Sequence, residues 1–408
     1  MTLRFCDGNQ ITLLNSGREY FPALLAALQG AQQEIFLETY IFAGDATANA
    51  VLERLCTAAA RGVRVQVLID GFGARDMPDV YRERLVRSGA RLLEYRRPVL
   101  WRPVRGLRRM HRKIAVIDGA LAEGAVAAVA FVGGINIIDD WNTPDEVPPR
   151  FDYAVQVQGA LVADIAAAAR HLWNVTTLAR LHGLAGRSVQ RRAPRTAGAP
   201  ESTIMCPRLP GAGMRAALAV RDNLLHRTAI EDAYLDAIKT ARSHIILASG
   251  YFLPSRRVFR ALRGAALRGV TVTVLLPGPT DHLLMKAASQ SLYRRLLGAG
   301  IGVVEYTKSF LHAKVAVVDD EWATVGSSNF DPFSLLLARE ANVVVQDAAF
   351  ARQLRESLES AMTAGGTRVT ADSVLRASWP ARAMQWLAYR FARITVDLVM
   401  PSGARKVV

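Results

Sequence analysis

Arg61-Gly-Val-Arg-Val-Gln-Val-Leu-Ile-Asp-Gly71 and Arg268-Gly-Val-Thr-Val-Thr-Val-Leu-Leu276 are two copies of one segment, one in each half of the chain. Their valines, leucines and isoleucines predict a buried strand in each copy. In the first half, Glu34-Ile-Phe-Leu-Glu-Thr-Tyr-Ile-Phe42 predicts an earlier strand, residues 47–60 have a helical pattern, and Gly89-Ala-Arg-Leu-Leu-Glu-Tyr95 predicts a later strand.

The second half repeats this order of segments. His244-Ile-Ile-Leu-Ala-Ser-Gly-Tyr-Phe252 predicts the first strand, a helix is expected to end near Leu267, and Gly300-Ile-Gly-Val-Val-Glu-Tyr306 predicts the last strand. Strands separated by helices indicate crossovers in which parallel strands are covered by helices on both faces of the sheet. We therefore expect an α/β protein made of two homologous α/β/α domains with mostly parallel sheets.

The domain boundaries are expected where the composition changes. Residues 183–200 have the high Gly, Pro and Arg content of an exposed linker. The predicted division is an N-terminal domain over residues 1–185, a linker over 186–200, a C-terminal domain over 201–370 and a basic amphipathic segment over 371–408.

The protein is strongly basic, with a net charge of +15 and a pI near 10.3. Such an excess indicates a polyanionic partner, either nucleic acid or an anionic membrane surface. The mean hydropathy of +0.14 favours the membrane. Because 51% of the residues are hydrophobic, the chain can bury a substantial core.

No membrane-spanning or targeting segment is visible in the sequence. No apolar run reaches the ~18 residues that a spanning helix needs, and the N-terminus MTLRFCDGNQ lacks the apolar region of a signal peptide. Three widely spaced cysteines, Cys6, Cys56 and Cys206, indicate neither a disulfide framework nor a zinc site. We expect the chain to be made and kept in the cytoplasm.

One motif follows the last predicted strand of each half. The first copy is His111-Arg-Lys113-Ile-Ala-Val-Ile-Asp118, with Gly133-Gly-Ile-Asn136 after it, and the second is His312-Ala-Lys314-Val-Ala-Val-Val-Asp319, with Gly326-Ser327-Ser-Asn329 after it. Only six of the 51 basic residues are lysines, yet two of them stand in this pattern, so chance does not explain the pair. Residues two apart on a strand share a face, which places each histidine beside its lysine.

These residue types suit phosphodiester transfer, which needs a nucleophile, an acid and positive charge around the phosphoryl oxygens. One imidazole can attack phosphorus to form a phosphohistidine. The other can protonate the leaving oxygen and then deprotonate the incoming hydroxyl. Two lysines and two asparagines can hold the non-bridging oxygens. No group of His, Cys or carboxylates with metal-ligand spacing is visible, so neither a metal nor another cofactor is expected.

The paired motifs resemble the phospholipase D superfamily over nearly the whole chain. The closer resemblance is to the bacterial cardiolipin synthases, specifically the B type. The segments that carry it are Arg109-Met-His-Arg-Lys113, Gly133-Gly-Ile-Asn136, Asp152-Tyr-Ala-Val155, Trp322-Ala-Thr-Val-Gly-Ser-Ser-Asn-Phe-Asp-Pro332 and Glu340-Ala-Asn342.

The resemblance implies a phospholipase D-like fold with the active site at the domain interface. It implies a phosphatidyltransferase that moves a phosphatidyl group from one phosphatidylglycerol to another and releases glycerol, at the cytoplasmic side of a bacterial inner membrane as a peripheral protein. His111 would be the attacking histidine, and two carboxylates would orient the histidines. The implied catalytic residues are His111, Lys113, Asp118, His312, Lys314 and Asp319, and the implied phosphate-binding or supporting residues are Asn136, Ser327, Asn329, Asp152 and Glu340.

The first half departs from the second by eight extra residues. Asp118 and Gly133 are 15 positions apart, whereas Asp319 and Gly326 are 7 apart, and the difference lies in Gly119–Val132. This insertion predicts a lengthened hairpin at the end of the strand that is distant from the phosphate, where it would affect substrate access or partner contacts.

Two basic stretches could contact anionic head groups. Arg96–Arg109 interleaves six arginines with Trp101 and two leucines, a composition that also suits a solvated loop or nucleic acid. Residues 382–394 would form a helix with arginine and aromatic residues in one sector and apolar residues in the next. That helix could lie in a membrane interface or pack on its own domain.

Three functions remain compatible with the sequence. The leading one is lipid phosphatidyl transfer, with anionic phospholipids favoured over nucleic acid as partners. A phospholipase D, phosphodiesterase or endonuclease of the same superfamily would use water as the acceptor. A catalytically silent binding scaffold would require decayed motifs, whereas both His–Lys pairs are intact.

Overall fold

The computed structural model describes the chain apart from its ends and several internal segments. The residues it describes are 3–96, 109–119, 128–144, 146–181, 213–222, 227–278, 283–331, 338–376, 378–379 and 383–390. The predicted linker lies outside these residues, as do most of the basic stretch Arg96–Arg109 and the tip of the predicted long hairpin.

Twelve of the labelled elements belong to the first half. They are β1 (Cys6–Asn15), α1 (Ser16–Gly30), β2 (Glu34–Thr39), α2 (Ala46–Ala60), β3 (Arg64–Asp70), α3 (Asp79–Arg87), β4 (Arg91–Tyr95), β5 (Arg109–Met110), β6 (Ile114–Ile117), β7 (Val129–Gly133), β8 (Tyr153–Gly159) and α5 (Leu161–Leu181).

The second half repeats this order and ends with further short elements. They are β9 (Met214–Arg221), α6 (Ala229–Thr240), β10 (His244–Ser249), α7 (Arg256–Leu267), β11 (Thr271–Pro277), α8 (Leu283–Gln290), α9 (Tyr293–Gly298), β12 (Ile301–Tyr306), β13 (Lys314–Val318), β14 (Trp322–Gly326), β15 (Ala338–Gln346), α11 (Ala348–Gly365), β16 (Gly366–Arg368) and α12 (Ala371–Leu375).

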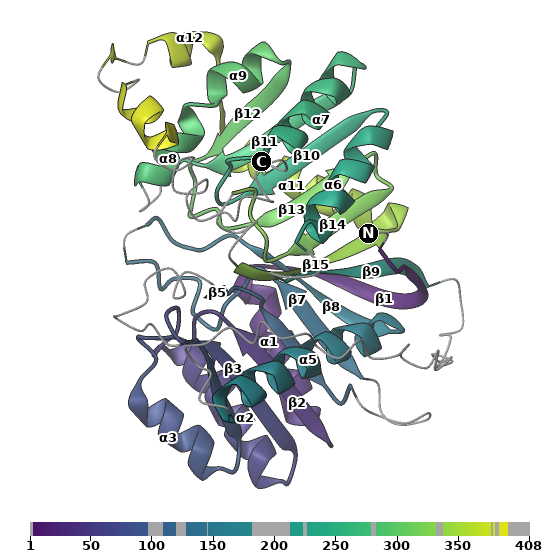
Figure 1. Ribbon diagram of the computed structural model, residues 1–408, viewed down its shortest axis with the longest axis vertical. Coiled ribbons are helices and arrows are strands. Elements are labelled where there is room, and N and C mark those ends of the chain that lie inside the picture. The colour runs from purple at the N-terminus through teal and green to yellow at the C-terminus, as the bar shows by residue number, and fades with distance from the viewer. Residues whose placement is uncertain are drawn as a thin grey trace.

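One sheet runs through both halves of the molecule (Figure 1). Its strand order is β16-β12-β11-β10-β13-β14-β15-β9-β1-β8-β7-β6-β2-β3-β4, with β5 attached to β15. The order on either side of the central β9–β1 pair is the same, so the two halves are related by an approximate twofold axis through that pair. The outer repeated strands were predicted from their sequence pattern, whereas β1 and β9, which join the halves, were not.

The α/β class is confirmed, but the expectation of mostly parallel sheets is wrong for the middle of the sheet. Parallel pairing joins β2 to β3 and β3 to β4, and likewise β10 to β11 and β11 to β12. The strands within the motifs, β6 and β13, instead pair as antiparallel hairpins with the strands that follow them, β7 and β14. No crossover helix separates the two strands of either hairpin, so the chain reverses direction between them. The first of them is the hairpin that the insertion predicted.

The repeat extends to local contacts. Gly62 and Gly269 each follow a helix end, α2 and α7, with a φ of +91°, a left-handed conformation that glycine adopts without strain. The preceding arginines make equivalent bonds: Arg61 donates to the carbonyls of Gln29 and Ala31, and Arg268 donates to those of Ile238 and Ala241. Each arginine thus ties one helix end to the end of the neighbouring helix, α1 or α6.

Helices cover both faces of the sheet (Figure 1). α5 and α11 pack on one face, in a single hydrophobic cluster that also contains strand residues of both halves. On the other face, α1, α2 and α3 cover the first half, and α6, α7 and α9 cover the second. A strand with both faces covered is mostly apolar, which explains the hydrophobic runs that predicted β2 and β10.

The first half contains a buried ion pair for which the second half has only alanines. Arg112 donates to both carboxylate oxygens of Glu38, over 2.9 and 2.6 Å, and both side chains are buried. The two motifs and the two first strands align Arg112 with Ala313 and Glu38 with Ala248. The fold therefore does not require this ion pair, as long as both charged residues are replaced together.

We expect Arg112→Ala to lower the free energy of unfolding by about 3–5 kcal/mol, because it leaves the Glu38 carboxylate buried without its partner. The double variant Glu38→Ala/Arg112→Ala should lose less, since it reproduces the alanine pair of the second half. Urea unfolding followed by circular dichroism measures both variants. A double variant less stable than Arg112→Ala would contradict this explanation.

Candidate active site

The two motif histidines lie where the halves meet, and each is held by the opposite half. His111 precedes β6, and its backbone N–H donates to the carbonyl of Arg339 over 3.0 Å. His312 precedes β13, and its N–H donates to the carbonyl of Phe151 over 2.8 Å. β5 pairs with β15, and Phe151 forms a β-bridge with Leu311. The backbone hydrogen bonds of the two histidines therefore extend strand pairing between the two halves.

Each imidazole also contacts a carboxylate from the opposite half. His111 Nδ1 lies 3.0 Å from Glu340 Oε1, and His312 Nδ1 lies 2.6 Å from Asp152 Oδ2. A carboxylate can only accept, so each Nδ1 carries the proton and donates it. Each Nε2 is then unprotonated in the neutral ring, which is the form that a nucleophile or a general base requires.

The two motif lysines lie beside the histidines and are buried. Lys113 Nζ donates to the backbone carbonyl of His111 over 2.7 Å, and Lys314 Nζ donates to that of His312. Lys314 Nζ also lies 2.8 Å from His312 Nδ1 and 3.5 Å from Asp152 Oδ2. We assign the Nδ1 proton to the bond with Asp152 because that contact is shorter and the ammonium has no acceptor to offer.

Burial shifts the pKa values of the charged groups in this site. It lowers the pKa of Lys113 to about 7, against the attraction of Glu340, and the pKa of Lys314 to about 8, against that of Asp152. Burial and Lys314 lower the pKa of His312 to about 3, so this ring is neutral in the empty site. Burial acts to raise the pKa of Asp152, but Lys314 and His312 outweigh it and hold that pKa below its ordinary value. The site therefore has buried cations that an anion would stabilise.

We expect kcat/KM to fall as the pH rises from 7 to 9. The pKa values of about 7 and about 8 mean that the ammonium forms of Lys113 and Lys314 are lost over this range in the free enzyme, and neutral amines no longer attract a phosphodiester. Rates at low substrate concentration between pH 6 and 9.5 measure the profile. A profile that is flat up to pH 9 would contradict the lowered pKa values.

The residues that follow each motif support the carboxylates. Ser327 Oγ donates to Glu340, so the serine orients the carboxylate that holds His111. Gly134 stands at the equivalent place in the first half, and a Cβ there would lie 2.3 Å from Asp152 Oδ1. Only glycine leaves room for the Asp152 carboxylate. Ser327, predicted to bind phosphate or to support the site, thus contacts one of the orienting carboxylates.

The two trailing asparagines are both buried but bonded differently. Asn136 Oδ1 accepts from the backbone N–H of Ile41 over 3.1 Å. Asn329 Oδ1 has no hydrogen-bond partner within the described part of the chain. A buried amide oxygen without a partner costs free energy, which marks Asn329 as a place where a bound molecule would donate.

Asp118 and Asp319, which the resemblance placed in the catalytic set, lie outside the site at the other ends of β6 and β13. Asp118 accepts from the backbone N–H groups of Gln32, Gln33 and Glu34, just before β2. Asp319 accepts from those of Arg242, Ser243 and His244 before β10. Both hold the start of a neighbouring strand. Their assignment to the catalytic set is wrong because the strand separates them from the histidines.

Sequence reasoning missed Tyr40, whose ring lies edge-on to the ring of His111 at 5.1 Å between centroids. Lys113 Nζ lies 5.5 Å from the centre of the same ring. Tyr40 directly follows β2, in the segment that predicted a strand, and an aromatic residue there is equally typical of a core. The one available signal was the comparison of the repeats, because Gly250 occupies the equivalent place in the second half.

Paired His–Lys motifs on two related halves of one sheet define the phospholipase D-like class of proteins. A solved structure titled as phosphatidylserine synthase from Haemophilus influenzae Rd KW20 has the same fold, with a TM-score of 0.66 over 97% of this chain and 96% of that one at 15% identity. The family model described as "Cardiolipin synthase, PLD-like domain" matches residues 24–147 and 234–362. The chain belongs to this cardiolipin synthase family.

Curated relatives agree with the family model. Cardiolipin synthase B of Escherichia coli K12 is 36% identical over 389 residues, which cover 95% of this chain and 88% of the relative. Cardiolipin synthase A of Pseudomonas putida is 30% identical over 352 residues, which cover 86% of this chain and 67% of the relative.

Proposed function

We propose that this protein is a cardiolipin synthase, which transfers a phosphatidyl group from one phosphatidylglycerol to another and releases glycerol. The observation that carries the proposal is the pair of imidazoles at the junction of the halves, each held through Nδ1 by a carboxylate of the opposite half. This arrangement leaves one Nε2 to act as the nucleophile and the other to act as the acid and base in both displacements. The relatives named cardiolipin synthase support the choice of substrate.

In the first displacement, Nε2 of His111 attacks the phosphorus of phosphatidylglycerol, and the bond from phosphorus to the glycerol oxygen breaks. The leaving oxygen takes a proton from Nε2 of His312. Burial and Lys314 keep the pKa of His312 low. Nε2 of His312 therefore binds this proton only when the anionic substrate offsets the charge of Lys314. A phosphatidyl-histidine and free glycerol result.

In the second displacement, Nε2 of His312 accepts the proton of a hydroxyl on the second phosphatidylglycerol. That oxygen attacks the phosphohistidine, and the bond from phosphorus to His111 breaks to give cardiolipin. Lys113, Lys314, Asn136 and Asn329 would hold the non-bridging oxygens in both steps. The orienting carboxylates stabilise each imidazolium when it forms.

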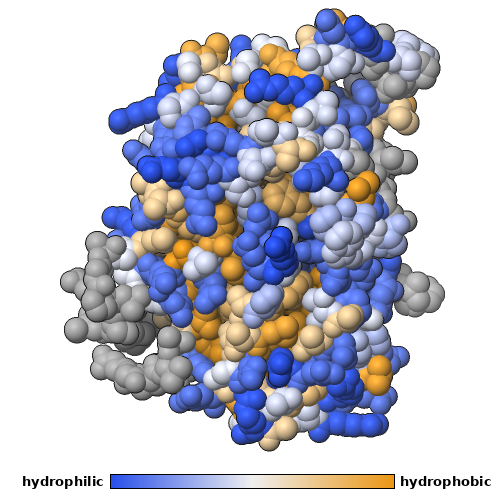
Figure 2. Space-filling view, turned by 180° about the vertical axis from the view of Figure 1, so that it is seen from behind, coloured by the Kyte–Doolittle hydropathy of each residue, from blue (hydrophilic) through white to orange (hydrophobic). Residues whose placement is uncertain are grey.

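Exposed apolar residues support binding to a membrane surface. Within the described residues, no helix is both long enough and apolar enough to cross a bilayer. The helical residues 383–390 pack through the buried Ala388 but expose Trp386 and Leu387 by 59% each, and Arg390 lies over the Trp386 ring. On the face drawn in Figure 2, orange residues lie among blue ones across its middle and lower part. With the net charge of +15, these features support peripheral attachment to a surface of anionic phospholipids. The location that we propose is the cytoplasmic side of a bacterial inner membrane.

The test is to incubate the purified protein with phosphatidylglycerol vesicles, without added metal, and to analyse the lipids. Cardiolipin and glycerol are expected in equal amounts. Phosphatidic acid as the only product would favour a phospholipase D that uses water. Hydrolysis of nucleic acid with no lipid product would favour an endonuclease.

A further inference from the structure

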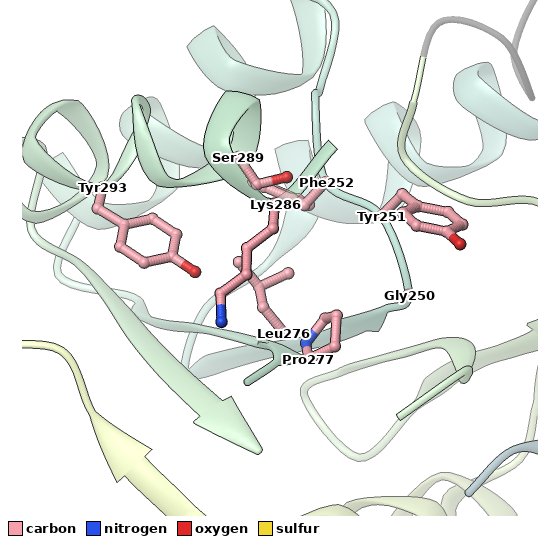
Figure 3. A pocket seen from close by; sticks show the side chains of 8 residues that line it. All are labelled: Gly250, Tyr251, Phe252, Leu276, Pro277, Lys286, Ser289 and Tyr293. Carbon is pink, nitrogen blue, oxygen red and sulfur yellow. The ribbon is translucent and has the colours of Figure 1, made fainter. Parts of the chain in front are cut away.

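A pocket opens in the second half, beside the site. It lies between the end of β11, the segment that follows β10, and the helices α8 and α9. In Figure 3 the side chain of Lys286 points into it above Leu276 and Pro277, with Tyr293 on one side and Gly250 on the other. An ammonium and a hydroxyl, those of Lys286 and Ser289, are among the groups that line it, and they suit a polar head group rather than acyl chains.

Two residues that line the pocket differ from their counterparts in the first half. Ser249 Oγ donates to the carbonyl of Tyr251 as Thr39 Oγ1 donates to that of Ile41, which aligns Gly250 with Tyr40. The alignment of β11 with β3 likewise matches Pro277 to Asp70. In the first half, the Tyr40 ring packs beside His111 and against Gly73. In the second half, Gly250 places no side chain beside His312.

Gly250 also joins the pocket to the catalytic residues. A Cβ on Gly250 would lie 3.4 Å from Asn329 Oδ1 and 3.6 Å from His312 Cα. The unpartnered amide oxygen of Asn329 therefore faces the position where the pocket wall has no side chain. A hydroxyl at this wall could donate to Asn329 and lie beside His312.

The pocket also contains a cation. Lys286 Nζ donates one hydrogen to the carbonyl of Gly278, and an ammonium has three, so two remain. Within the described residues, no carboxylate forms an ion pair with Lys286. The Ser289 hydroxyl lines the same pocket, whereas the Tyr293 hydroxyl donates to Glu305 over 2.8 Å. An anionic group bound here would contact Lys286 and Ser289.

We propose that this pocket is the alcohol subsite, which holds the glycerol head group of the acceptor phosphatidylglycerol, with Lys286 binding the phosphodiester of that lipid. This proposal rests on the proposed function and deepens it. The leaving and attacking oxygens occupy the same side of phosphorus in turn, opposite the attacking imidazole. A pocket beside His312 therefore places the leaving alcohol and the incoming alcohol on the His312 side of phosphorus, and it leaves the attack to His111. Beside the His111 ring, Tyr40 occupies the equivalent position.

Substitution of Lys286 separates acceptor binding from chemistry. Two reactions are measured with phosphatidylglycerol vesicles: formation of cardiolipin, and exchange of labelled free glycerol into phosphatidylglycerol. Both use the same phosphohistidine, but free glycerol has no phosphodiester. We expect Lys286→Met to slow cardiolipin formation about tenfold while glycerol exchange stays within about twofold of the wild type. Lys239→Met, on the surface of α6, is the matched control and should change neither rate.

Substitution of Gly250 tests the position of the pocket. Gly250→Tyr copies the residue of the first half and should slow both cardiolipin formation and glycerol exchange about tenfold or more, because its ring would occupy the alcohol space. Circular dichroism melting verifies the fold, and the Lys286→Met result decides alone if Gly250→Tyr is unfolded.

Several results would overturn the proposal. Equal losses of cardiolipin formation and glycerol exchange in Lys286→Met, or no loss of cardiolipin formation, would refute the assignment of the pocket while the wild type still makes cardiolipin. A folded Gly250→Tyr variant with wild-type rates would do the same. A wild-type protein that yields neither product would overturn the proposed function, and this inference with it.

Discussion

Replacing either His111 or His312 by alanine is expected to lower phosphatidyl transfer by about 10⁴-fold or more, because each displacement needs one Nε2 as nucleophile and the other as acid or base. The two losses should not add, because the loss of either histidine already stops turnover. Both side chains are partly exposed, 17% for His111 and 14% for His312, so their removal leaves no large cavity and the fold should persist.

Lipid analysis after incubation with phosphatidylglycerol vesicles measures this loss. His171→Ala, on an exposed turn of α5, is the matched control and should retain wild-type activity. Trapping the phosphohistidine separates the two residues: His312→Ala should still accumulate label on His111 if that imidazole attacks. A single histidine variant that retains a tenth of the wild-type rate would rule out the double displacement.

Asp152→Asn and Glu340→Gln are expected to lower activity by about 10²- to 10⁴-fold, although both substitutions preserve shape. Each carboxylate fixes the Nδ1 proton of a histidine in the opposite half, and an amide can instead donate its own hydrogen to Nδ1. The proton of the ring then moves to Nε2, the atom that must attack or accept. The loss should therefore appear in kcat more than in KM.

The ring nitrogens report this change directly. Nitrogen NMR of labelled histidine should show the Nε2–H tautomer of His312 in Asp152→Asn and of His111 in Glu340→Gln. Asp236→Asn, on the surface of α6, serves as the control for a lost aspartate charge. If Asp152→Asn changed the tautomer of His111 and left His312 unaltered, the pairing across the halves would be wrong.

Much of the fold could be predicted because its signals are local. The runs that became β2, β3, β10 and β11 are apolar and β-branched, as strands covered on both faces must be. β1 and β9 were missed because the repeat was recognised from β2 and β10 onward, and residues such as Asp7, Asn9 and Gln10 interrupt the apolar pattern of β1. The two strands pair with each other at the centre of the sheet, which no local pattern records.

The repeat, the two His–Lys pairs and their place at strand ends can be read from the sequence, because periodicity and spacing are properties of neighbouring residues. Which carboxylate holds which histidine depends on the fold. Glu340 and His111 are 229 residues apart, and Asp152 and His312 are 160 apart, so each pairing exists only because β5 joins β15 and Phe151 bridges Leu311. The fold also places Asp118 and Asp319 at the far ends of their strands, away from the site, and it places Gly250, the counterpart of Tyr40, in the wall of a pocket in the second half.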